Sequence, residues 1–325
     1  MCFKDDRAVS NFKLRISREC CLIAVAGVLL CGTLPASSAQ PAALFRHRPV
    51  YAVAAIPTPV LDTPKFRAVF GGRSGGTLRL NKEGEFVDLE FIALPGTVFT
   101  VQRTMWGRPP KILKVTTPDY PYPTRRGYYI DSRFVKILNE KPSERKKILP
   151  SEETILDHLL SCAGLPYLWG GNVSGGIPEM LALYPPARNL IEGEKSKWTL
   201  KGLDCSGLLY EATNGGTPRD AIGMVSFGTP VHIEGLSVDG IITQVQPLDV
   251  IAWNTHMMII LDRKRIIESR PYYDYPDKKM PDGVRIRPLR EALEETMHTK
   301  TAVDDYRQPQ RGMRKHFVIR RWYHG

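Results

Sequence analysis

The chain has 325 residues, of which 42% are apolar and 24% are charged, and its formal net charge is +11. This balance is typical of a globular protein and excludes a chain that is disordered throughout. Because single domains commonly hold about 150 residues, the length predicts two folded units after any targeting segment.

The first 39 residues have the three parts of a secretory signal. Basic residues precede an apolar run at 20–34, and small residues follow at 36–39. We expect cleavage after Ala39 and export to the periplasm or cell wall of a bacterium. The run of 15 residues is shorter than the roughly 20 that cross a bilayer, so a permanent anchor is the alternative. Cys31 leaves a lipoprotein as another, although Leu30 stands where lipid-attachment sites usually have a small residue.

Four of the six cysteines fall in this segment, which leaves Cys162 and Cys205. Two cysteines do not make a disulfide scaffold, so each thiol needs its own explanation, with one disulfide between them as the alternative. Cys162 falls in the last turn of a predicted helix without a basic neighbour in the sequence. We expect it to be a small buried residue.

The predicted signal holds five Lys or Arg and three Asp or Glu, so its removal lowers the net charge from +11 to about +9. A basic exported protein favours anionic partners such as wall polymers or a membrane surface. The sequence has no nucleic-acid-binding motif and no aromatic residues interleaved with basic ones, so we expect no nucleic acid partner.

Residues 46–138 predict a small all-β domain. Short apolar runs broken by Gly and Pro indicate strands at 86–94, 96–103, 112–116 and 127–130, spaced as in a small barrel. The segments 95–99, 112–115 and 127–130 resemble a bacterial SH3-like domain, and a different small β-domain is the alternative. A charged linker at 139–150, which few contacts are expected to cross, marks the boundary to a second domain at 151–325.

The second domain begins with helices and ends with a sheet. Ser151 is a candidate N-cap, and Gly164 and Pro166 end the first helix. Another helix is predicted to begin at Cys205 with Asp204 as its N-cap. Apolar extended runs follow at 249–253, 256–261, 265–269 and 284–287, and this order predicts an α+β domain.

Cys205 and His256 are the candidate reactive pair. A helix N-terminus and a nearby histidine both lower the pKa of a thiol, whereas the adjacent Asp204 opposes the thiolate. His256 begins a strongly apolar strand, and strand ends often present catalytic groups. Taken singly, a buried structural cysteine and a histidine with satisfied hydrogen bonds are the alternatives. Cys, His and Glu are also zinc ligands, but no CxxC or HxxxH pair accompanies them, so we predict no metal and no cofactor at this pair.

Five segments in one order resemble the NlpC family of peptidoglycan cysteine peptidases, over roughly 151–288. They are GLPYLWGG at 164–171, LDCSGL at 203–208, TPR at 217–219, PLDVI at 247–251 and HMMIIL at 256–261.

The resemblance implies a reduced papain-like α+β fold and cleavage of peptidoglycan stem peptides, typically between D-glutamate and a diamino acid. It also implies that Cys205 is the nucleophile and His256 the general base, and that the Cys205 amide stabilises the oxyanion. Tyr167 and Trp169 would line the site. Asp204 and Ser206 could bind the free amine of the substrate.

The chain departs from the family pattern at three places. Glu268 stands where the family has His, Asn or Gln; we expect it to orient the His256 ring, with a register slip or a surface glutamate as the alternative. Between Gly171 and Asp204 lie 32 residues, more than the family usually has, and this insertion is either a specificity loop walling the cleft or a surface excursion. Residues 257–258 are Met-Met, where the family has a smaller pair.

Two other functions remain open at this stage. One is a wall-binding protein that keeps the fold without the activity. The other is a thiol amidase or acyl transferase on the same fold.

Overall fold

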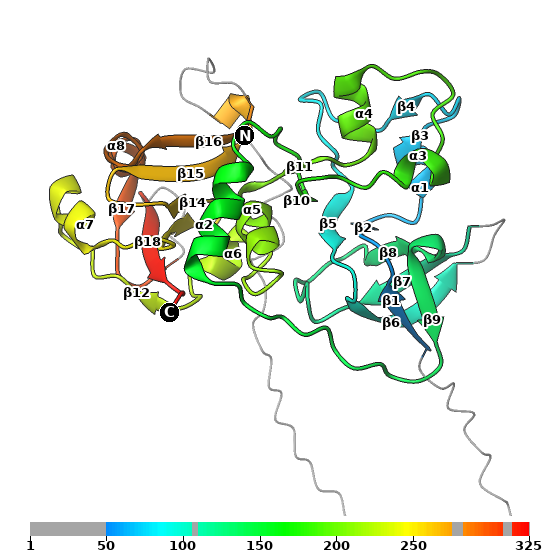
Figure 1. Ribbon diagram of the computed structural model, residues 1–325, viewed down its shortest axis with the longest axis horizontal. Helices are drawn as coiled ribbons and strands as arrows, with labels where there is room; N and C mark the ends of the chain where they lie inside the picture. The colour runs from blue at the N-terminus through cyan, green and yellow to red at the C-terminus, as the bar shows by residue number, and fades with distance from the viewer. Residues whose placement is uncertain (1–49, 106–109, 275–281, 308–313, 325) are drawn as a thin grey trace, which may run out of the picture. The chain divides into compact units, whose positions relative to one another are not determined.

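The computed structural model describes residues 50–105, 110–274, 282–307 and 314–324 (Figure 1). The chain divides into residues 1–48 and one compact unit at 49–325. The predicted signal peptide and its cleavage site lie outside the described residues. Among the helices that the structure describes, none is long and apolar enough to span a membrane.

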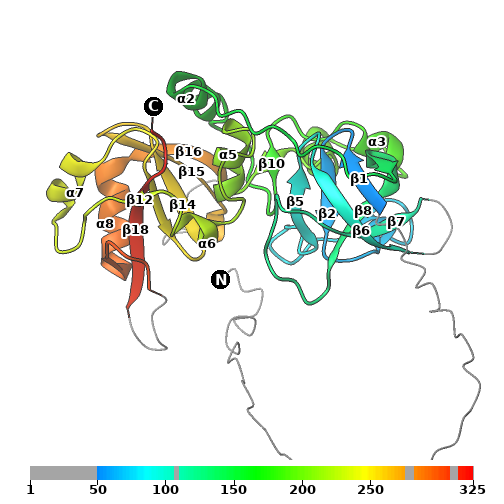
Figure 2. The ribbon, with the colours of Figure 1, turned by 90° about the horizontal axis from the view of Figure 1, so that it is seen from below.

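An antiparallel sheet of seven strands forms the N-terminal part of this unit (Figures 1 and 2). Its spatial order is β5 (Leu89–Ala93), β2 (Thr58–Leu61), β8 (Tyr128–Asp131), β7 (Ile112–Thr116), β6 (Val98–Met105), β1 (Val50–Ala54) and β9 (Val135–Leu138). The pairings leave β5 and β9 at the edges, so the described strands form an open sheet without a closing pair. The SH3-like barrel therefore stays a prediction.

A second sheet carries the C-terminal part. Its order is β12 (Thr229–Pro230), β18 (Lys315–Arg321), β13 (Val250–Trp253), β14 (His256–Ile260), β15 (Arg265–Arg270) and β16 (Gly283–Pro288), and β17 (Lys300–Ala302) pairs parallel to β18. The strands β13 to β16 follow the four predicted runs closely. No strand was expected from the sequence at β18, although this strand lies between β12 and β13 inside the sheet.

The middle strands of this sheet are buried on both faces, which explains their unbroken apolar sequence. Successive side chains point to opposite faces. On one face Val250 and Met257 pack with residues of α2 (Glu152–Ser161), α5 (Cys205–Ala212) and α6 (Ala221–Met224). On the other, Ile251 and Met258 pack with α7 (Val238–Gln244) and α8 (Leu289–Thr299). This is the mixed helix and sheet content that the sequence predicted.

The helices start at the predicted caps. The Ser151 hydroxyl accepts a hydrogen bond from the Thr154 amide at 3.3 Å, and Asp204 accepts one from the Gly207 amide at 2.7 Å. Both contacts satisfy first-turn N–H groups that have no partner inside the helix. Local sequence therefore places α2 and α5.

The insertion at 172–203 belongs to a shared core and is not a surface excursion. It forms β10 (Asn172–Val173), α3 (Met180–Leu183), α4 (Glu192–Trp198) and β11 (Gly202–Leu203). Its buried Ile177 and Met180 pack in one cluster with residues of the first sheet and of α1 (Phe66–Val69), next to the hairpin β3 (Phe70–Gly71) and β4 (Thr77–Leu78). The side-chain amide of Asn172 pairs with the backbone of Ile92 in β5. Its oxygen accepts from the Ile92 N–H at 3.0 Å, and its nitrogen donates to the Ile92 carbonyl at 2.7 Å.

The predicted linker at 139–150 contains no helix or strand, and its side chains contact other parts of the chain. The domain boundary expected there stays a prediction. The Arg145 guanidinium donates to the carbonyl of Asn214 at 2.8 Å, at the end of α5, and lies 3.8 Å from the Asp119 carboxylate. Lys147 lies 2.7 Å from the same carboxylate. The linker therefore joins residues on both of its sides.

Candidate active site

Cys205 is the first residue of α5, and its side chain is partly buried. Both Cys205 and Cys162 are free thiols, which excludes the alternative of a disulfide between them. The carboxylate before Cys205 is fixed as the helix cap, because Asp204 accepts from the Gly207 amide at 2.7 Å and from the Gly170 amide at 3.0 Å.

Arg219 is the buried counter-ion of Asp204. Its guanidinium donates to both carboxylate oxygens, at 2.9 and 2.7 Å, and to Asn172 Oδ1 at 2.9 Å. The Ser206 hydroxyl donates to the Arg219 carbonyl at 2.9 Å. A buried carboxylate needs a paired cation. Arg219 is the arginine of the TPR segment, so this segment was the signal in the sequence for a contact with Asp204. The predicted role of Asp204 and Ser206 in binding a substrate amine stays a prediction, and such an amine would compete with Arg219.

His256 and Glu268 form a buried pair. The ring Nε2 lies 2.7 Å from Glu268 Oε2, and the other carboxylate oxygen accepts from Arg287 at 2.7 Å. Only 1% of the Glu268 surface is exposed, so this residue is not a surface glutamate. The contact is the one expected of a residue that orients the ring, and its effect on catalysis stays a prediction. The sequence analysis did not single out Arg287.

The electrostatic surroundings keep Glu268 ionised. Burial by itself raises the pKa of this carboxyl, but the hydrogen bond from His256 and the charges of Arg270 and Arg287 outweigh it and lower the pKa to about 2.

The thiol of Cys205 lies beside the backbone at the start of β14. The Met257 amide donates a hydrogen bond to it, and Met257 directly follows His256. Burial, and then the negative charge of Asp204, raise the pKa of the thiol well above its usual range, against the opposing effects of this amide and of Arg219. The resting thiol is therefore protonated.

The His256 ring and the thiol approach the strand from different sides. Cys205 packs against the apolar cluster that includes residues of α5. The centre of the His256 ring lies 5.2 Å from the centre of the Trp253 ring, and Trp253 belongs to the apolar cluster that includes residues of α8. No hydrogen bond joins thiol and ring in the part of the chain that the structure describes, nor does His256 Nδ1 have a partner there. Catalytic hydrogen bonds are often long in the absence of substrate.

A basic pocket opens beside His256. Its lining includes Trp253, Arg270, Lys300 and Lys315. The Lys300 ammonium lies 4.1 Å from the centre of the Trp253 ring, and burial, then repulsion from Arg270 and Lys315, lower the pKa of Lys300 to about 8. The arrangement fits an anionic group near the histidine.

Tyr167 and Trp169 line a different pocket, together with Tyr272, Tyr273 and Lys197. The backbone of Tyr167 bridges to Leu203, two residues before Cys205, so this pocket is linked to the nucleophile through the chain. The role of both aromatic residues in binding substrate stays a prediction.

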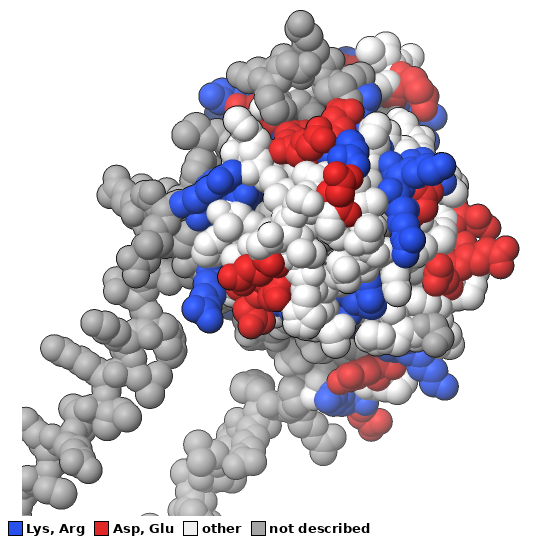
Figure 3. All heavy atoms as spheres, turned by 90° about the vertical axis from the view of Figure 1, so that its left-hand side faces the viewer, with Lys and Arg blue, Asp and Glu red and all other residues white. Residues whose placement is uncertain are grey.

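On the side of the molecule that carries α7, the positive charge does not form a continuous patch. Figure 3 shows the side that carries α7, where Lys and Arg side chains are interspersed with Asp and Glu.

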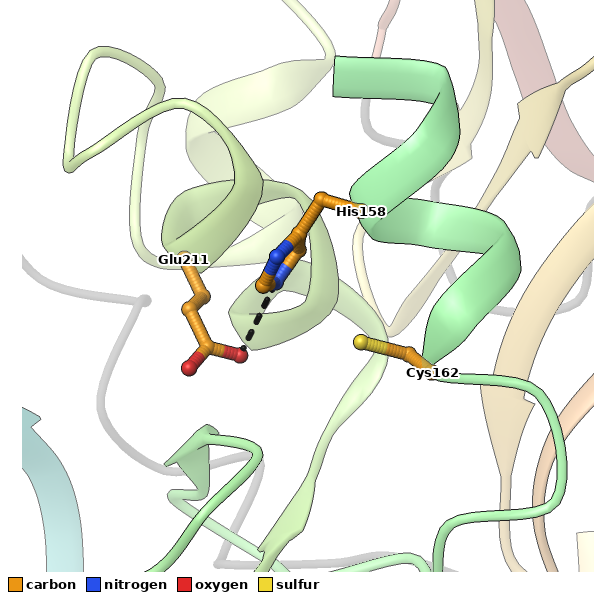
Figure 4. Close-up of side chains that lie close together, drawn as sticks. All are labelled: His158, Cys162 and Glu211. Carbon is orange, nitrogen blue, oxygen red and sulfur yellow. Dashed lines mark hydrogen bonds and ion pairs between the residues drawn. The ribbon is translucent and has the colours of Figure 1, made fainter. Parts of the chain in front are cut away.

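A second group of reactive side chains lies between α2 and α5. His158, Cys162 and Glu211 converge there (Figure 4). Cys162 is buried as expected, but the expectation that it lacks a basic neighbour is wrong, because His158 stands one helical turn earlier on the same face.

No family model matches the sequence, and no curated protein matches it. Among solved structures, an NlpC/P60 family protein from Bacillus cereus is 13% identical with a TM-score of 0.31, over 85% of this chain and 64% of that chain. RipD from Mycobacterium tuberculosis, described as a non-catalytic NlpC/p60 domain protein adapted to a peptidoglycan-binding function, is 19% identical with a TM-score of 0.27, over 42% of this chain and 86% of that chain. The resuscitation promoting factor interacting protein RipA is 21% identical with a TM-score of 0.28, over 52% of this chain and 61% of that chain.

This chain spans less than two thirds of the length of the Bacillus cereus structure and of the RipA structure. At identities of 13–21% and TM-scores of 0.27–0.31, the likeness assigns neither an activity nor site residues to this chain.

Proposed function

We propose that this protein is an exported cysteine peptidase of the NlpC/P60 type that hydrolyses peptide bonds in peptidoglycan stem peptides. The observation that carries the proposal is the buried His256–Glu268 pair at 2.7 Å. The next residue after His256 is Met257, whose amide donates a hydrogen bond to the Cys205 thiol. A nucleophile, a base and a group that orients the base are the three parts of a thiol peptidase. The ordered motifs of the sequence support the same reading.

The reaction begins with a proton transfer. Because the resting thiol is protonated, His256 Nδ1 takes the proton as sulfur attacks the carbonyl carbon of the scissile bond. The pair with Glu268 holds Nε2 and stabilises the imidazolium that forms. The first-turn amide of Cys205 points out of the helix N-terminus and donates to the oxyanion.

The second half of the reaction releases two products. The imidazolium gives its proton to the leaving amine, and a thioester on Cys205 remains. Water, deprotonated by the same histidine, then hydrolyses the thioester and returns the free thiol. No metal or cofactor takes part in these steps.

The basic pocket supports a substrate that carries carboxylates. Stem peptides have them, and Lys300 and Lys315 would attract one beside the reacting bond. The bond that the motif resemblance favours lies between D-glutamate and the diamino acid. The predicted signal peptide supports action outside the cytoplasm, in the periplasm or wall.

Defined muropeptides test the proposal. The purified protein and its Cys205→Ala variant are incubated with fragments that carry tripeptide or tetrapeptide stems, and the products are identified by mass spectrometry. Cleavage by the wild type alone is expected, and the product masses name the bond and distinguish hydrolysis from amide or acyl transfer. Equal cleavage by both proteins contradicts the thiol mechanism.

One observation favours a non-catalytic wall-binding protein as the second candidate. The ring of His256 lies 5.2 Å from that of Trp253, which packs in the apolar cluster with α8. The thiol packs against the cluster with α5 and keeps its proton. In that case the wild type and Cys205→Ala would bind muropeptides with the same affinity and release no product from either stem.

A further inference from the structure

Three potential metal ligands converge between α2 and α5, away from the Cys205–His256 pair. His158 and Cys162 are four positions apart, so both project from the same face of α2. Glu211 comes from α5 and points towards them (Figure 4). One ligand atom from each residue lies within 4.8 Å of the other two.

The spacing of these atoms suits a small metal ion. Ligand atoms held tetrahedrally at about 2.0–2.3 Å from zinc stand roughly 3.3–3.8 Å apart. The distance between His158 Nε2 and Glu211 Oε2 is 3.3 Å, long for a charge-assisted hydrogen bond but equal to such an edge. The Cys162 sulfur lies within 4.8 Å of a ring nitrogen of His158 and of a carboxylate oxygen of Glu211, and it would be the third ligand.

The carboxylate has its own support. Glu211 Oε1 accepts from the Ser174 amide at 2.9 Å and from the Ser174 hydroxyl at 3.0 Å, and Oε2 accepts from the same amide at 3.1 Å and lies 3.3 Å from His158 Nε2. Carboxylate ligands of metals are usually fixed in this way by a second layer of hydrogen bonds.

Charge and access agree with a cation at this point. The Glu211 carboxylate lies 3.3 Å from His158 Nε2 between the two helices, where it would offset the charge of a bound cation. Cys162 is 1% exposed, whereas the side chains of His158 and Glu211 are 33% and 17% exposed, which leaves a route from solvent. The C-terminal end of a helix also favours positive charge, and Cys162 caps that end of α2.

We propose that His158, Cys162 and Glu211 bind one zinc ion, with a water molecule as the fourth ligand. A thiolate combined with an imidazole selects zinc over magnesium or calcium. The ion would fasten α2 to α5, the helix whose first residue is Cys205, and through Ser174 to the segment after β10. The site is separate from the proposed peptidase chemistry and does not depend on it.

Metal content and cobalt spectroscopy test the site without an activity assay. The full chain is used with Cys2→Ser, Cys20→Ser, Cys21→Ser and Cys31→Ser, so that Cys162 and Cys205 are the only thiols. After zinc loading and dialysis, one zinc per chain is expected, together with a higher Tm than that of the protein treated with chelator. With cobalt in place of zinc, a thiolate-to-cobalt charge-transfer band is expected.

Paired variants locate the ion. Cys162→Ala should abolish the cobalt band, and His158→Gln should weaken zinc binding about 100-fold, whereas Cys205→Ala and His298→Gln, an exposed histidine, should leave both unchanged. Circular dichroism confirms that each variant is folded, and the partly exposed His158 gives a second variant in case Cys162→Ala does not fold. Absence of retained zinc in the parent protein overturns the proposal, as does a cobalt band that disappears with Cys205→Ala instead.

Discussion

Each of the two carboxylates next to the proposed reactive pair is neutralised by a buried arginine. Asp204 pairs with Arg219, and Glu268 pairs with Arg287. An unpaired buried charge would cost several kcal/mol, so neither arginine can be removed without consequence. The arrangement lets one carboxylate cap the nucleophile helix while the other holds the ring of the proposed base.

Replacing Glu268 by glutamine keeps the shape of the side chain and removes its charge. We expect Glu268→Gln to lower kcat/KM on muropeptides by about 10-fold or more, because the imidazolium loses its counter-ion and the ring can adopt the wrong tautomer. Glu291→Gln is the matched control, since Glu291 also contacts Arg287, at 3.2 Å, but is exposed. A rate for Glu268→Ala within about threefold of the wild type would remove the orienting role.

Lys300 predicts a pH dependence of substrate binding. Its pKa is about 8, lowered from 10.5, so the side chain is charged below that pH and becomes neutral above it. Attraction of an anionic substrate therefore weakens as the pH rises from 7 to 9, and KM should increase over this range. In Lys300→Met the increase should be much smaller, whereas the exposed Lys264→Met should behave as the wild type. The ratio of KM values between variant and wild type is the measurement, because it cancels changes common to both.

The start of α5 is the element on which the site depends. Arg219 ties its cap to the loop at 170–172, through Asp204 and the carbonyl of Gly171. Glycine is required at 207, where an added Cβ would lie 1.9 Å from that carbonyl oxygen. The nucleophile helix, the loop before it and the TPR segment thus form one connected support.

Removing the guanidinium tests this support. Arg219→Met leaves the Asp204 carboxylate buried without a counter-ion, and we expect the free energy of unfolding to fall by about 3–5 kcal/mol. Urea unfolding followed by circular dichroism gives the value. Arg290→Met removes an arginine whose partners among the described residues are exposed carboxylates, and should change stability by less than about 1 kcal/mol. A similar small change for Arg219→Met would mean that solvent reaches Asp204.

At the scale of the whole molecule, the insertion and the first sheet share one core. Tyr184 donates a hydrogen bond to Asp131 of β8, and Arg133 donates to the carbonyl of Leu183 at 2.8 Å. Ile177, Met180 and Leu200 have no exposed surface within this core. Burial of apolar side chains contributes roughly 1.5–3 kcal/mol each, so these contacts couple the stability of the two sequence regions.

This coupling predicts a single unfolding unit. Calorimetry of the full chain should show one transition, and a fragment at 151–325 should bind a hydrophobic dye and unfold at a lower temperature, because its insertion lacks the first sheet. Removing residues 1–39 provides the control, since they lie outside the described unit. A fragment with the Tm of the full chain would show that the second region folds independently.

Local signals were enough to predict many of the elements. Caps at Ser151 and Asp204 and continuous apolar runs placed α2, α5 and β13 to β16, because these signals act over a few residues. The spacing of the motifs also placed Glu268, twelve positions after His256 on the neighbouring strand, within hydrogen-bond distance of the ring.

Contacts between distant residues were decided only by the tertiary structure. β1 pairs with β6 and β9, and β18 pairs with β12 and β13, all of them distant in the sequence. The insertion packs in a core that is built mostly from another part of the chain. In the same way, Arg219 meets Asp204, Arg287 meets Glu268, and His158 and Cys162 meet Glu211 on a different helix. The sequence determined which residues could react or bind, because chemistry belongs to side chains. Folding decided which of them meet, because the free energy of burial depends on contacts that no local pattern specifies.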